Sequence, residues 1–212
     1  MTLAMMKKFL WIFSLAGLLF ACNNNDDPEP KPVNENAITV LAYLVANNDI
    51  EYALKDNIIT MFKGLYNVEY ETSLLIYWDG KSQLGDISTP VVLKYTTDGK
   101  GQINGKAITN TALTLEEVVN LAEIVEKYPS QISTNKQVMT KVLNDMVEHV
   151  KTSKIGLIAG SHASSWVPAA SSRAFGDDGG TSIQIADMAE AMLSTNKTFD
   201  FLLFDACLMG SA

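Results

Sequence analysis

The sequence predicts an α/β fold in which helices flank both faces of a mostly parallel sheet. Short, nearly all-apolar runs at 38–46, 154–160 and 199–204 are typical of strands buried in such a sheet. The segments between them repeat apolar residues every three to four positions, which is the spacing of helices that bury one face. The alternation of these two patterns indicates a three-layer sandwich.

The first predicted strand covers 38–46. Asn47, Asn48 and Asp49 follow it and are expected to cap the next helix, because short polar side chains accept hydrogen bonds from the first backbone N–H groups of a helix. Gly64 stands near the predicted end of that helix. The apolar stripe of the helix consists of Leu54, Ile58, Met61, Phe62 and Leu65.

Two further strands are predicted at 72–78 and 91–95, and the first of them is expected to end in a turn at Asp79-Gly80. Residues 97–106 are rich in glycine and short polar residues and predict a loop or hairpin. The same composition could suggest a calcium loop, but the spacing of the ligands is poor, so a solvated turn is favoured.

The segment Thr114-Leu-Glu-Glu117 is a capping box, which predicts a helix that stops at Pro129. The inner face of this helix would consist of Val118, Leu121, Ala122 and Val125. Another helix is predicted at 135–152, where His149 falls off the apolar stripe near the helix end. A solvated histidine favoured by the helix dipole is the preferred interpretation of His149, ahead of a catalytic role.

A histidine and a cysteine follow two of the apolar runs. His162 comes after 154–160 and stands 45 residues before Cys207, which comes after 199–204. Sites in open α/β sheets form at the carboxyl ends of strands, and caspase-type enzymes separate base and nucleophile by about 50 residues. A free cysteine beside an apolar run is more often a small buried hydrophobe, but this spacing favours a Cys-His dyad.

The residues around the dyad resemble the clostripain family of cysteine peptidases, relatives of the caspases and gingipains. The motifs that carry the resemblance are Ile158-Ala-Gly-Ser-His-Ala-Ser-Ser-Trp166, Phe175-Gly-Asp-Asp178 and Phe199-Asp-Phe-Leu-Leu-Phe-Asp-Ala-Cys-Leu-Met-Gly210. Tyr43-Leu-Val-Ala-Asn-Asn-Asp49 and Tyr77-Trp-Asp-Gly80 are similar to the family's first strand and its Asp-Gly turn. The resemblance covers about residues 38 to 212 and implies a caspase-like fold.

The resemblance also implies catalytic roles. Cys207 would be the nucleophile and His162 the general base, and the backbone N–H groups of Ala163 and Cys207 would hold the oxyanion. Ala163 stands where the family usually has glycine, and its N–H can still donate if its φ is negative. Calcium dependence occurs in the family, but the sequence shows no acidic cage, so neither a metal nor another cofactor is assigned.

Acidic residues are expected to set the specificity. The family cleaves after Arg or Lys, and the resemblance places the acid of the substrate pocket at Asp205, although a strand-end Asp can also cap backbone N–H groups. Asp177 and Asp178 are expected either at the mouth of the site or in a solvated turn. Arg173, the only Arg of the chain, is expected at a self-processing site, because family members are cut between the His and Cys strands.

The first 21 residues are typical of a secretory signal. Lys7 and Lys8 precede an apolar core at 9–21, which is too short to span a bilayer. A buried amphipathic helix is disfavoured because the core has no polar face. Leu19-Phe-Ala-Cys22 resembles a bacterial lipobox, which predicts cleavage before Cys22 and diacylation of its thiol. Two acyl chains on one residue anchor a protein stably to a membrane.

Residues 22–36 are expected to be the lipidated Cys22 and a disordered tether, because this stretch contains three prolines and almost no apolar side chains. Its acidic pair resembles the surface-export signal of Bacteroidetes lipoproteins. Residues 37–212 would then form the amino-terminal portion of a clostripain-like peptidase domain. With Cys22 assigned to lipid, Cys207 has no cysteine partner in the chain and is a candidate reactive thiol.

The predicted function is that of an exported cysteine endopeptidase, lipid-anchored to a bacterial outer membrane, that cleaves after Arg or Lys. A net charge of −8 argues against nucleic acid as a partner and suits basic peptides. The alternatives are an inactive or incomplete clostripain-like lipoprotein that binds peptides and, less favoured, a thiol hydrolase or acyltransferase. The family continues far beyond its nucleophile, so the sheet is expected to be incomplete beside 199–204, with a separate C-terminal chain among the candidate partners.

Overall fold

The computed structural model describes residues 37–110, 112–164 and 173–207. The chain divides into two compact units, of which the first, Met1–Pro32, lies outside the described residues. The predicted signal, Cys22 and the tether therefore also lie outside them. All elements below belong to the second unit, and no helix of its described part is long and apolar enough to span a membrane.

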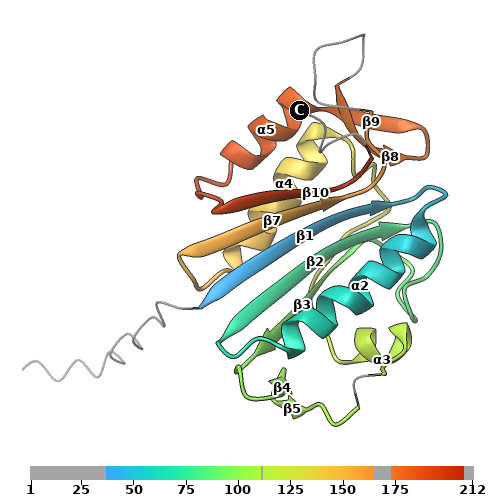
Figure 1. Cartoon of the computed structure of the whole chain (residues 1–212). Coiled ribbons are helices and arrows are strands. Elements are labelled where there is room, and N and C mark those ends of the chain that lie inside the picture. Colours follow the sequence, from blue (N-terminus) through green and yellow to red (C-terminus); the bar gives the residue numbers. More distant parts are fainter. Residues whose placement is uncertain (1–36, 111, 165–172, 208–212) are drawn as a thin grey trace, which may run out of the picture. The chain divides into compact units, whose positions relative to one another are not determined.

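An eight-stranded sheet forms the centre of this unit (Figure 1). The strand order is β10-β7-β1-β2-β3-β4-β5, with β6 paired to β3. From β10 to β2 the strands run parallel, and from β3 onwards they run antiparallel. The strands are β1 (Ile38–Ala46), β2 (Thr72–Gly80), β3 (Val91–Thr97), β4 (Gln102–Ile103), β5 (Lys106–Ala107), β6 (Glu123–Lys127), β7 (Lys154–Gly160) and β10 (Phe201–Asp205).

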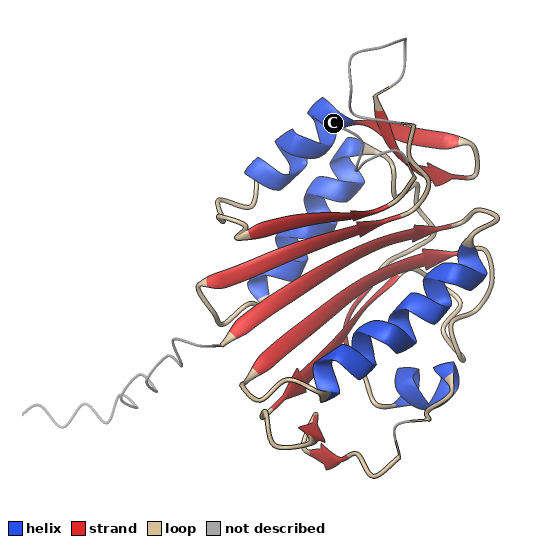
Figure 2. Cartoon of the chain, viewed as in Figure 1, coloured by secondary structure: helices blue, strands red, loops and turns tan. Residues whose placement is uncertain are grey.

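Helices cover both faces of the sheet, as the α/β prediction requires (Figure 2). The helices are α2 (Glu51–Tyr66), α3 (Leu115–Asn120), α4 (Lys136–Glu148) and α5 (Ile185–Leu193). Alternate residues of β1 point to opposite faces, so Leu41 and Tyr43 pack with α4 and α5, whereas Ala42 and Leu44 pack with α2 and α3. The three-layer sandwich predicted from the sequence is confirmed.

Several elements begin and end where the sequence predicted. The strands β1 and β7 match their apolar runs, and the hairpin of β4 and β5 lies in the turn-rich segment. The Thr114 side chain accepts a hydrogen bond from the Glu117 N–H, and the Glu117 carboxylate accepts from the Thr114 N–H, which confirms the capping box. The Asn135 side chain caps α4 in the same way.

The predicted helix that follows the capping box is wrong beyond Asn120. The next residues turn and continue as β6, which pairs antiparallel with β3. Pairing with the free edge of β3 satisfies the backbone groups of β6, and the adjacent β-branched side chains Ile124 and Val125 suit a strand. The helical spacing of the apolar residues was therefore overridden by a strand partner that is distant in sequence.

Two further local predictions need correction. Asp79 and Gly80 are the last two residues of β2 and not a turn. No side chain caps α2 at its N-cap residue, Ile50, although the Asn48 Oδ1 accepts a hydrogen bond from the Ile50 N–H.

Among the described strands, β10 lies at the edge of the sheet, which agrees with the expectation of an incomplete sheet beside 199–204. It is half-exposed, although its apolar run is typical of a strand that is buried. Within the described ranges its backbone pairs only with β7, and exposed fractions of 40%, 41% and 52% are found for Phe201, Leu202 and Leu203. The all-apolar run correctly indicated a parallel strand. How far β10 is buried depends on the elements that pack beside it, and the apolar run alone does not specify these elements.

A small hairpin of β8 (Ala174–Asp178) and β9 (Thr181–Gln184) was not predicted. Gly179 and Gly180 form its two-residue loop with φ of 57° and 92°. A Gly-Gly pair between strands is a recognised hairpin signal, because both loop residues need positive φ. The sequence therefore contained this signal.

Candidate active site

The candidate site lies where the direction of the sheet connections reverses. The connection through α2 leads from β1 to β2, toward the β5 end of the strand order. The connection through α5 leads from β7 to β10, in the opposite direction (Figure 1). The reversal therefore falls between β1 and β7, and crevices at such points are the usual binding sites of open α/β sheets. The loops that leave the carboxyl ends of the parallel strands β1, β7 and β10 lie at the same end of these strands.

His162 follows β7 and is held from two sides. Its backbone carbonyl accepts a hydrogen bond from the Gly176 N–H at 2.8 Å. Its imidazole Nε2 lies 2.6 Å from Oδ1 of Asp49, which follows β1. The hydrogen bond from His162 is the main cause that lowers the pKa of Asp49 below its ordinary value. The sequence pointed to Asp49 only as a helix cap, and its position after an apolar strand was the signal of a site residue.

A buried cluster, here called the polar knot, lies beside the His162–Asp49 pair and consists of Asn48, Ser161 and the backbone groups they bind. The Asn48 Nδ2 donates to the carbonyl oxygens of Val45 and Asp177 at 2.9 and 2.7 Å. The Ser161 Oγ donates to the Val45 carbonyl at 2.7 Å and accepts from the Asp177 N–H at 3.1 Å. Since both side chains are buried, the knot ties the ends of β1 and β7 to β8.

A second buried network, centred on Ser133, lies at the carboxyl end of β2, beside the same group of strand ends. The Ser133 Oγ donates to the Asp79 carboxylate and accepts from the Tyr77 hydroxyl, and the Ser133 N–H donates to Asp178 Oδ2. The other Asp178 oxygen accepts from the Asn47 side chain at 2.7 Å. Burial raises the pKa of Asp79 to about 6, the hydrogen bond from Ser133 opposes this shift, and the charge of Asp178 adds to it.

Cys207 is a free, exposed cysteine two residues beyond the end of β10. In the parallel pair of β7 and β10, Asp205 lies opposite Gly160. His162 and Cys207 are each two residues further along, so the register brings them to the same level at the ends of neighbouring strands. Adjacent strands are about 4.8 Å apart. Within the described residues no hydrogen bond joins the Cys207 thiol to His162.

The backbone of Ala163, which was predicted to help hold the oxyanion, faces Phe175 of β8. Ala163 is not among the described non-glycine residues with positive φ. It forms an isolated bridge with Phe175, in which the flanking residues make the hydrogen bonds, from Ser164 N–H to Ala174 O and from Gly176 N–H to His162 O. The Ala163 N–H therefore points away from β8, and it donates no hydrogen bond to any described residue.

The acidic residues named from the sequence lie in different surroundings. Asp205 is exposed at the end of β10, and its Oδ2 accepts a hydrogen bond from the Asn57 side chain of α2 at 2.5 Å. Asp177 is partly exposed, and its Oδ1 accepts from the Gly180 N–H at 2.8 Å. Asp178 is buried in the Ser133 network and does not lie in a solvated turn. Arg173 is exposed at the start of β8.

An open cleft of about 580 Å³ surrounds the His162–Asp49 pair. It is lined by Asn47, Asn48, Asp49, Lys81, His162, Asp177, Gly179 and Gly180. The lining is polar and contains both signs of charge, which suits a peptide backbone with charged side chains. No group of three or more His, Cys, Asp or Glu residues in the described part of the chain could hold a metal ion. We therefore assign no metal ligands and derive no step through a metal.

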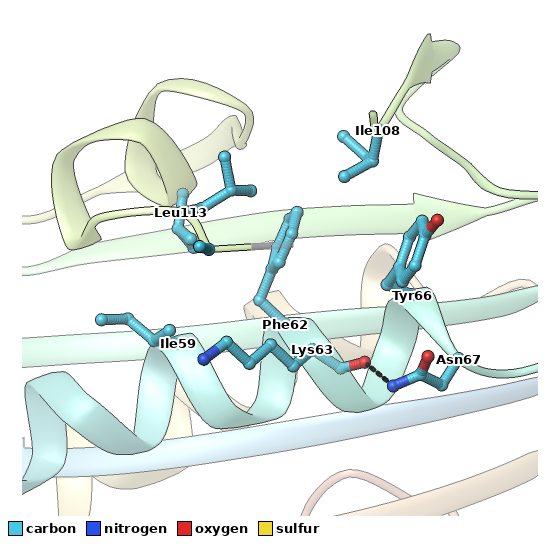
Figure 3. A pocket seen from close by; sticks show the side chains of 9 residues that line it. Ile59, Phe62, Lys63, Tyr66, Asn67, Ile108 and Leu113 are labelled. Carbon is cyan, nitrogen blue, oxygen red and sulfur yellow. Dashed lines mark hydrogen bonds between the residues drawn. The ribbon is translucent and has the colours of Figure 1, made fainter. Parts of the chain in front are cut away.

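Another hollow, of about 460 Å³, lies between α2 and the segment before and within α3 (Figure 3). It is lined by Ile59, Phe62, Lys63, Tyr66, Asn67, Ile108, Ala112, Leu113 and Val118. The Asn67 side chain donates to the Lys63 carbonyl at 2.9 Å. The lining contains no His, Cys, Asp or Glu, so this hollow lacks the residue types of the predicted dyad.

Comparisons with known proteins agree with this fold. The model of the clostripain family (Peptidase_C11) matches residues 42–212. Among solved structures, a secreted C11 cysteine protease from Bacteroides thetaiotaomicron, in complex with an irreversible peptide inhibitor, is 25% identical with a TM-score of 0.60. The match covers 82% of this chain and 43% of that one.

Two further solved structures share the fold. A secreted C11 cysteine protease of the same organism, called iotapain, is 18% identical with a TM-score of 0.60, over 86% of this chain and 48% of that one. An inactive zymogen of a C11 protease from Parabacteroides distasonis is 22% identical with a TM-score of 0.55, over 80% and 42%. The chain spans less than half the length of each of these three proteins. No curated protein sequence matches it.

Proposed function

Because the chain belongs to the clostripain family of cysteine peptidases, we propose that it carries the catalytic dyad of an endopeptidase that cleaves after Arg or Lys. Cys207 is the nucleophile and His162 the general base. The observation that supports this most is their placement after β10 and β7, two adjacent parallel strands whose register brings both residues to one level. In open α/β sheets, ligands usually bind in the crevice at the carboxyl ends of the strands where the strand order reverses, and both residues follow strands at that position.

The dyad would hydrolyse a peptide bond in two steps. His162 takes the proton of the Cys207 thiol, and the sulfur adds to the substrate carbonyl carbon. The C–N bond then breaks, the amine leaves with the proton from His162, and a thioester remains on Cys207. Water attacks the thioester as His162 takes a proton from it, and the carboxylic acid and the free thiol are released.

The oxyanion of each tetrahedral intermediate would be held by the N–H groups of Ala163 and Cys207. The Ala163 N–H, three residues beyond the end of β7, donates to no described residue, and Ala163 is not among the described residues with positive φ. Both observations support this role although the family usually has glycine there. Removing one such donor from an active site costs about 10²- to 10³-fold in rate. The two N–H groups would therefore carry much of the catalysis.

Specificity for a basic side chain would come from Asp205. Its carboxylate follows β10 two residues before the nucleophile, and the Asn57 side chain holds one of its oxygens. A positioned carboxylate favours a cationic side chain over a neutral one of similar size. Asp177, which lines the cleft beside His162, would assist in substrate binding, whereas Asp178 would brace the site from within.

Arg173 would be a self-processing site. It is exposed and directly follows residues 165–172, which lie outside the described residues. Its guanidinium is the cation that the proposed pocket would accept. Incubation of active protein should produce one fragment that ends at Arg173 and one that begins at Ala174, and a single intact band after prolonged incubation would exclude the proposal.

Export would depend on the signal at 1–21, and lipid anchoring on Cys22. The relatives described as secreted support export. The expected anchor is a diacylated Cys22 at the outer membrane, with residues 22–36 as the tether to the peptidase domain at 37–212. A labelled fatty acid should be incorporated into the wild-type protein in cells and not into Cys22→Ser. Equal labelling of the two proteins would contradict this assignment.

The experiment that tests the function is hydrolysis of fluorogenic peptides that end in Arg or Lys. It should be run on the protein expressed from its complete gene, because the chain spans less than half the length of the structures it matches. Activity that disappears in Cys207→Ala and in His162→Ala, at unchanged thermal stability, is the expected result. Binding of these peptides without turnover would favour the alternative, a peptide-binding lipoprotein, for which the replacement of the family's usual glycine by Ala163 is the supporting observation.

A further inference from the structure

The pair of His162 and Asp49 joins residues that are 113 positions apart. The register of β1 and β7, in which Leu44 lies opposite Gly160, brings the two strand ends together. The residue before each member of the pair, Asn48 and Ser161, belongs to the polar knot, and these two side chains lie 3.3 Å apart. Buried hydrogen bonds on both strands therefore fix the backbones that carry the exposed pair.

The geometry determines which nitrogen of His162 is protonated. A carboxylate has no proton to donate, so the contact with Asp49 requires a proton on Nε2. A neutral imidazole carries one N–H, which leaves Nδ1 with a free lone pair. When Nδ1 takes up a proton, the carboxylate also stabilises the resulting imidazolium, as in sites where a third group orients the base.

We propose that Asp49 is a positioning residue, which holds the His162 ring through Nε2–H and leaves Nδ1 to take the proton of Cys207. This inference rests on the proposed dyad. Asp49 itself touches neither substrate nor thiol in this role. It acts through His162, and its second effect is to oppose rotation of the imidazole, which would otherwise present the wrong nitrogen to the thiol.

The other histidine of the chain provides an internal comparison. His149 follows α4, and its Nε2 lies 3.3 Å from Oε1 of Glu126 on β6. That pair is away from the strand ends that build the site, and its nitrogen–oxygen distance is longer than the 2.6 Å of the Asp49 pair. A carboxylate beside a histidine therefore occurs twice, but only one pair lies in the catalytic cleft.

Kinetics of two substitutions test the proposal. Asp49→Ala should lower kcat by about 10- to 100-fold and leave KM within about twofold, because the hydrogen bond matters most when His162 is charged. Asp49→Asn keeps an acceptor for Nε2–H and should recover part of the lost kcat. Glu69→Ala removes an exposed carboxylate from the loop between α2 and β2. This loop leads into the amino end of β2, whereas the site lies at the carboxyl ends of the strands, so neither constant should change.

The kinetic constants also identify a different role for Asp49. If Asp49→Ala raises KM for Arg-ended peptides and leaves kcat unchanged, Asp49 binds the substrate cation and the proposal is overturned. Unchanged kcat and KM would overturn it as well. Asp49 is 83% exposed, so a folding defect is not expected to obscure the result.

An NMR measurement on this chain tests the inference separately from peptidase activity. The sequence contains two histidines, so a histidine-labelled sample gives two imidazole signals. In Asp49→Ala the order parameter of the His162 ring should fall, to below about 0.6, while that of His149 stays unchanged. An unaltered His162 ring would overturn the positioning role. A ring that is released in a protein without peptidase activity would instead show that the contact is real and the proposed function wrong.

Discussion

The two halves of the proposed dyad are built differently. His162 follows β7, which lies between β1 and β10, and the polar knot ties its strand end to β1 and β8. Cys207 follows β10, which pairs with β7 alone in the part of the chain that the structure describes and has exposed apolar side chains. The histidine half is therefore determined by buried hydrogen bonds. The cysteine half depends on one strand pairing and on the contacts of Phe204 and Ala206 with the core.

This difference predicts that substitutions in the two halves affect folding and catalysis in different ways. Substitutions around His162 remove buried partners, so they should change folding and catalysis together. Substitutions on β10 affect exposed atoms, so they should change catalysis with little effect on folding. The four predictions below test this contrast, and they are ordered by the size of the expected effect.

The largest effect is expected at Gly176, in the histidine half. Its φ is 83°, and an added Cβ would lie 2.6 Å from Cγ2 of Thr134. Gly176→Ala therefore combines backbone strain with a clash and should lower the free energy of unfolding by about 3 kcal/mol. Since the Gly176 N–H holds the His162 carbonyl, peptidase activity should fall as well. Urea unfolding and peptide hydrolysis measure the two effects.

Gly180→Ala is the matched control for Gly176→Ala. Gly180 has a similar φ of 92°, but an added Cβ would meet no atom within 4 Å. Its substitution should cost about 1 kcal/mol, which is the backbone strain without the clash. If both variants lose the same stability, packing against Thr134 does not fix the backbone at His162, and the proposed rigidity of this half is wrong.

The second prediction compares Ser161 in the polar knot with Leu203 on β10. Ser161→Ala removes a buried hydroxyl that donates to the Val45 carbonyl and accepts from the Asp177 N–H, and it should lower the free energy of unfolding by about 2 kcal/mol. Leu203 is 52% exposed, so Leu203→Ser should change it by less than about 0.5 kcal/mol. Chemical denaturation of both variants measures the difference. Equal losses would remove the contrast between the two halves.

The same contrast explains what the sequence could predict. The bounds of the strands β1 and β7 and the start of the helix α4 follow from local patterns of apolar residues and caps, so they were predicted closely. The predicted end of this helix, at 152, lies four residues beyond the observed end at Glu148. The open edge at β10 was expected from the resemblance to a longer family, not from its apolar run. The identity of β6 depends on the strand that lies beside it, and no local pattern encodes that. Cys207 and His162 were predicted from motifs and spacing, whereas the contact of Asp49 with His162 depends on the register between β1 and β7.

The third prediction concerns pH and Asp79. Burial raises the pKa of Asp79 from 3.8 to about 6, so the folded state favours the protonated carboxyl. The stability that this group contributes is present below about pH 4 and is lost as the pH rises through about 6. Asp79→Asn keeps an acceptor for the Ser133 hydroxyl without a charge. Between pH 4 and 7 the wild type should therefore lose about 1–2 kcal/mol relative to Asp79→Asn.

Urea unfolding of both proteins across this pH range measures the difference. Asp86→Asn, at an exposed position, serves as the control, and its stability should run parallel to that of the wild type. Parallel curves for Asp79→Asn and the wild type would show that Asp79 ionises without a cost from burial. The Ser133 network would then not be the buried support of the site.

The smallest effect is expected at Asn57, which reaches the cysteine half from α2. Its side chain occupies Oδ2 of Asp205, so fewer lone pairs remain for a guanidinium that binds two oxygens at once. Lysine needs one oxygen and is less affected. In Asn57→Ala, the ratio of kcat/KM for Arg-ended over Lys-ended peptides should rise by about three- to tenfold, with little change in stability because both partners are partly or fully exposed.

Thr60→Ala is the control for Asn57→Ala on the same helix. The Thr60 hydroxyl bonds only to the Asp56 carbonyl among the described residues, at 3.0 Å, so its loss should leave the Arg-to-Lys ratio unchanged. If both rates fall in proportion in Asn57→Ala, Asn57 positions Asp205 and does not select between the two cations. If neither rate changes, Asp205 is not the acid of the pocket. The ratio therefore tests whether the exposed half of the site, which contributes little to folding, determines which substrate is cleaved.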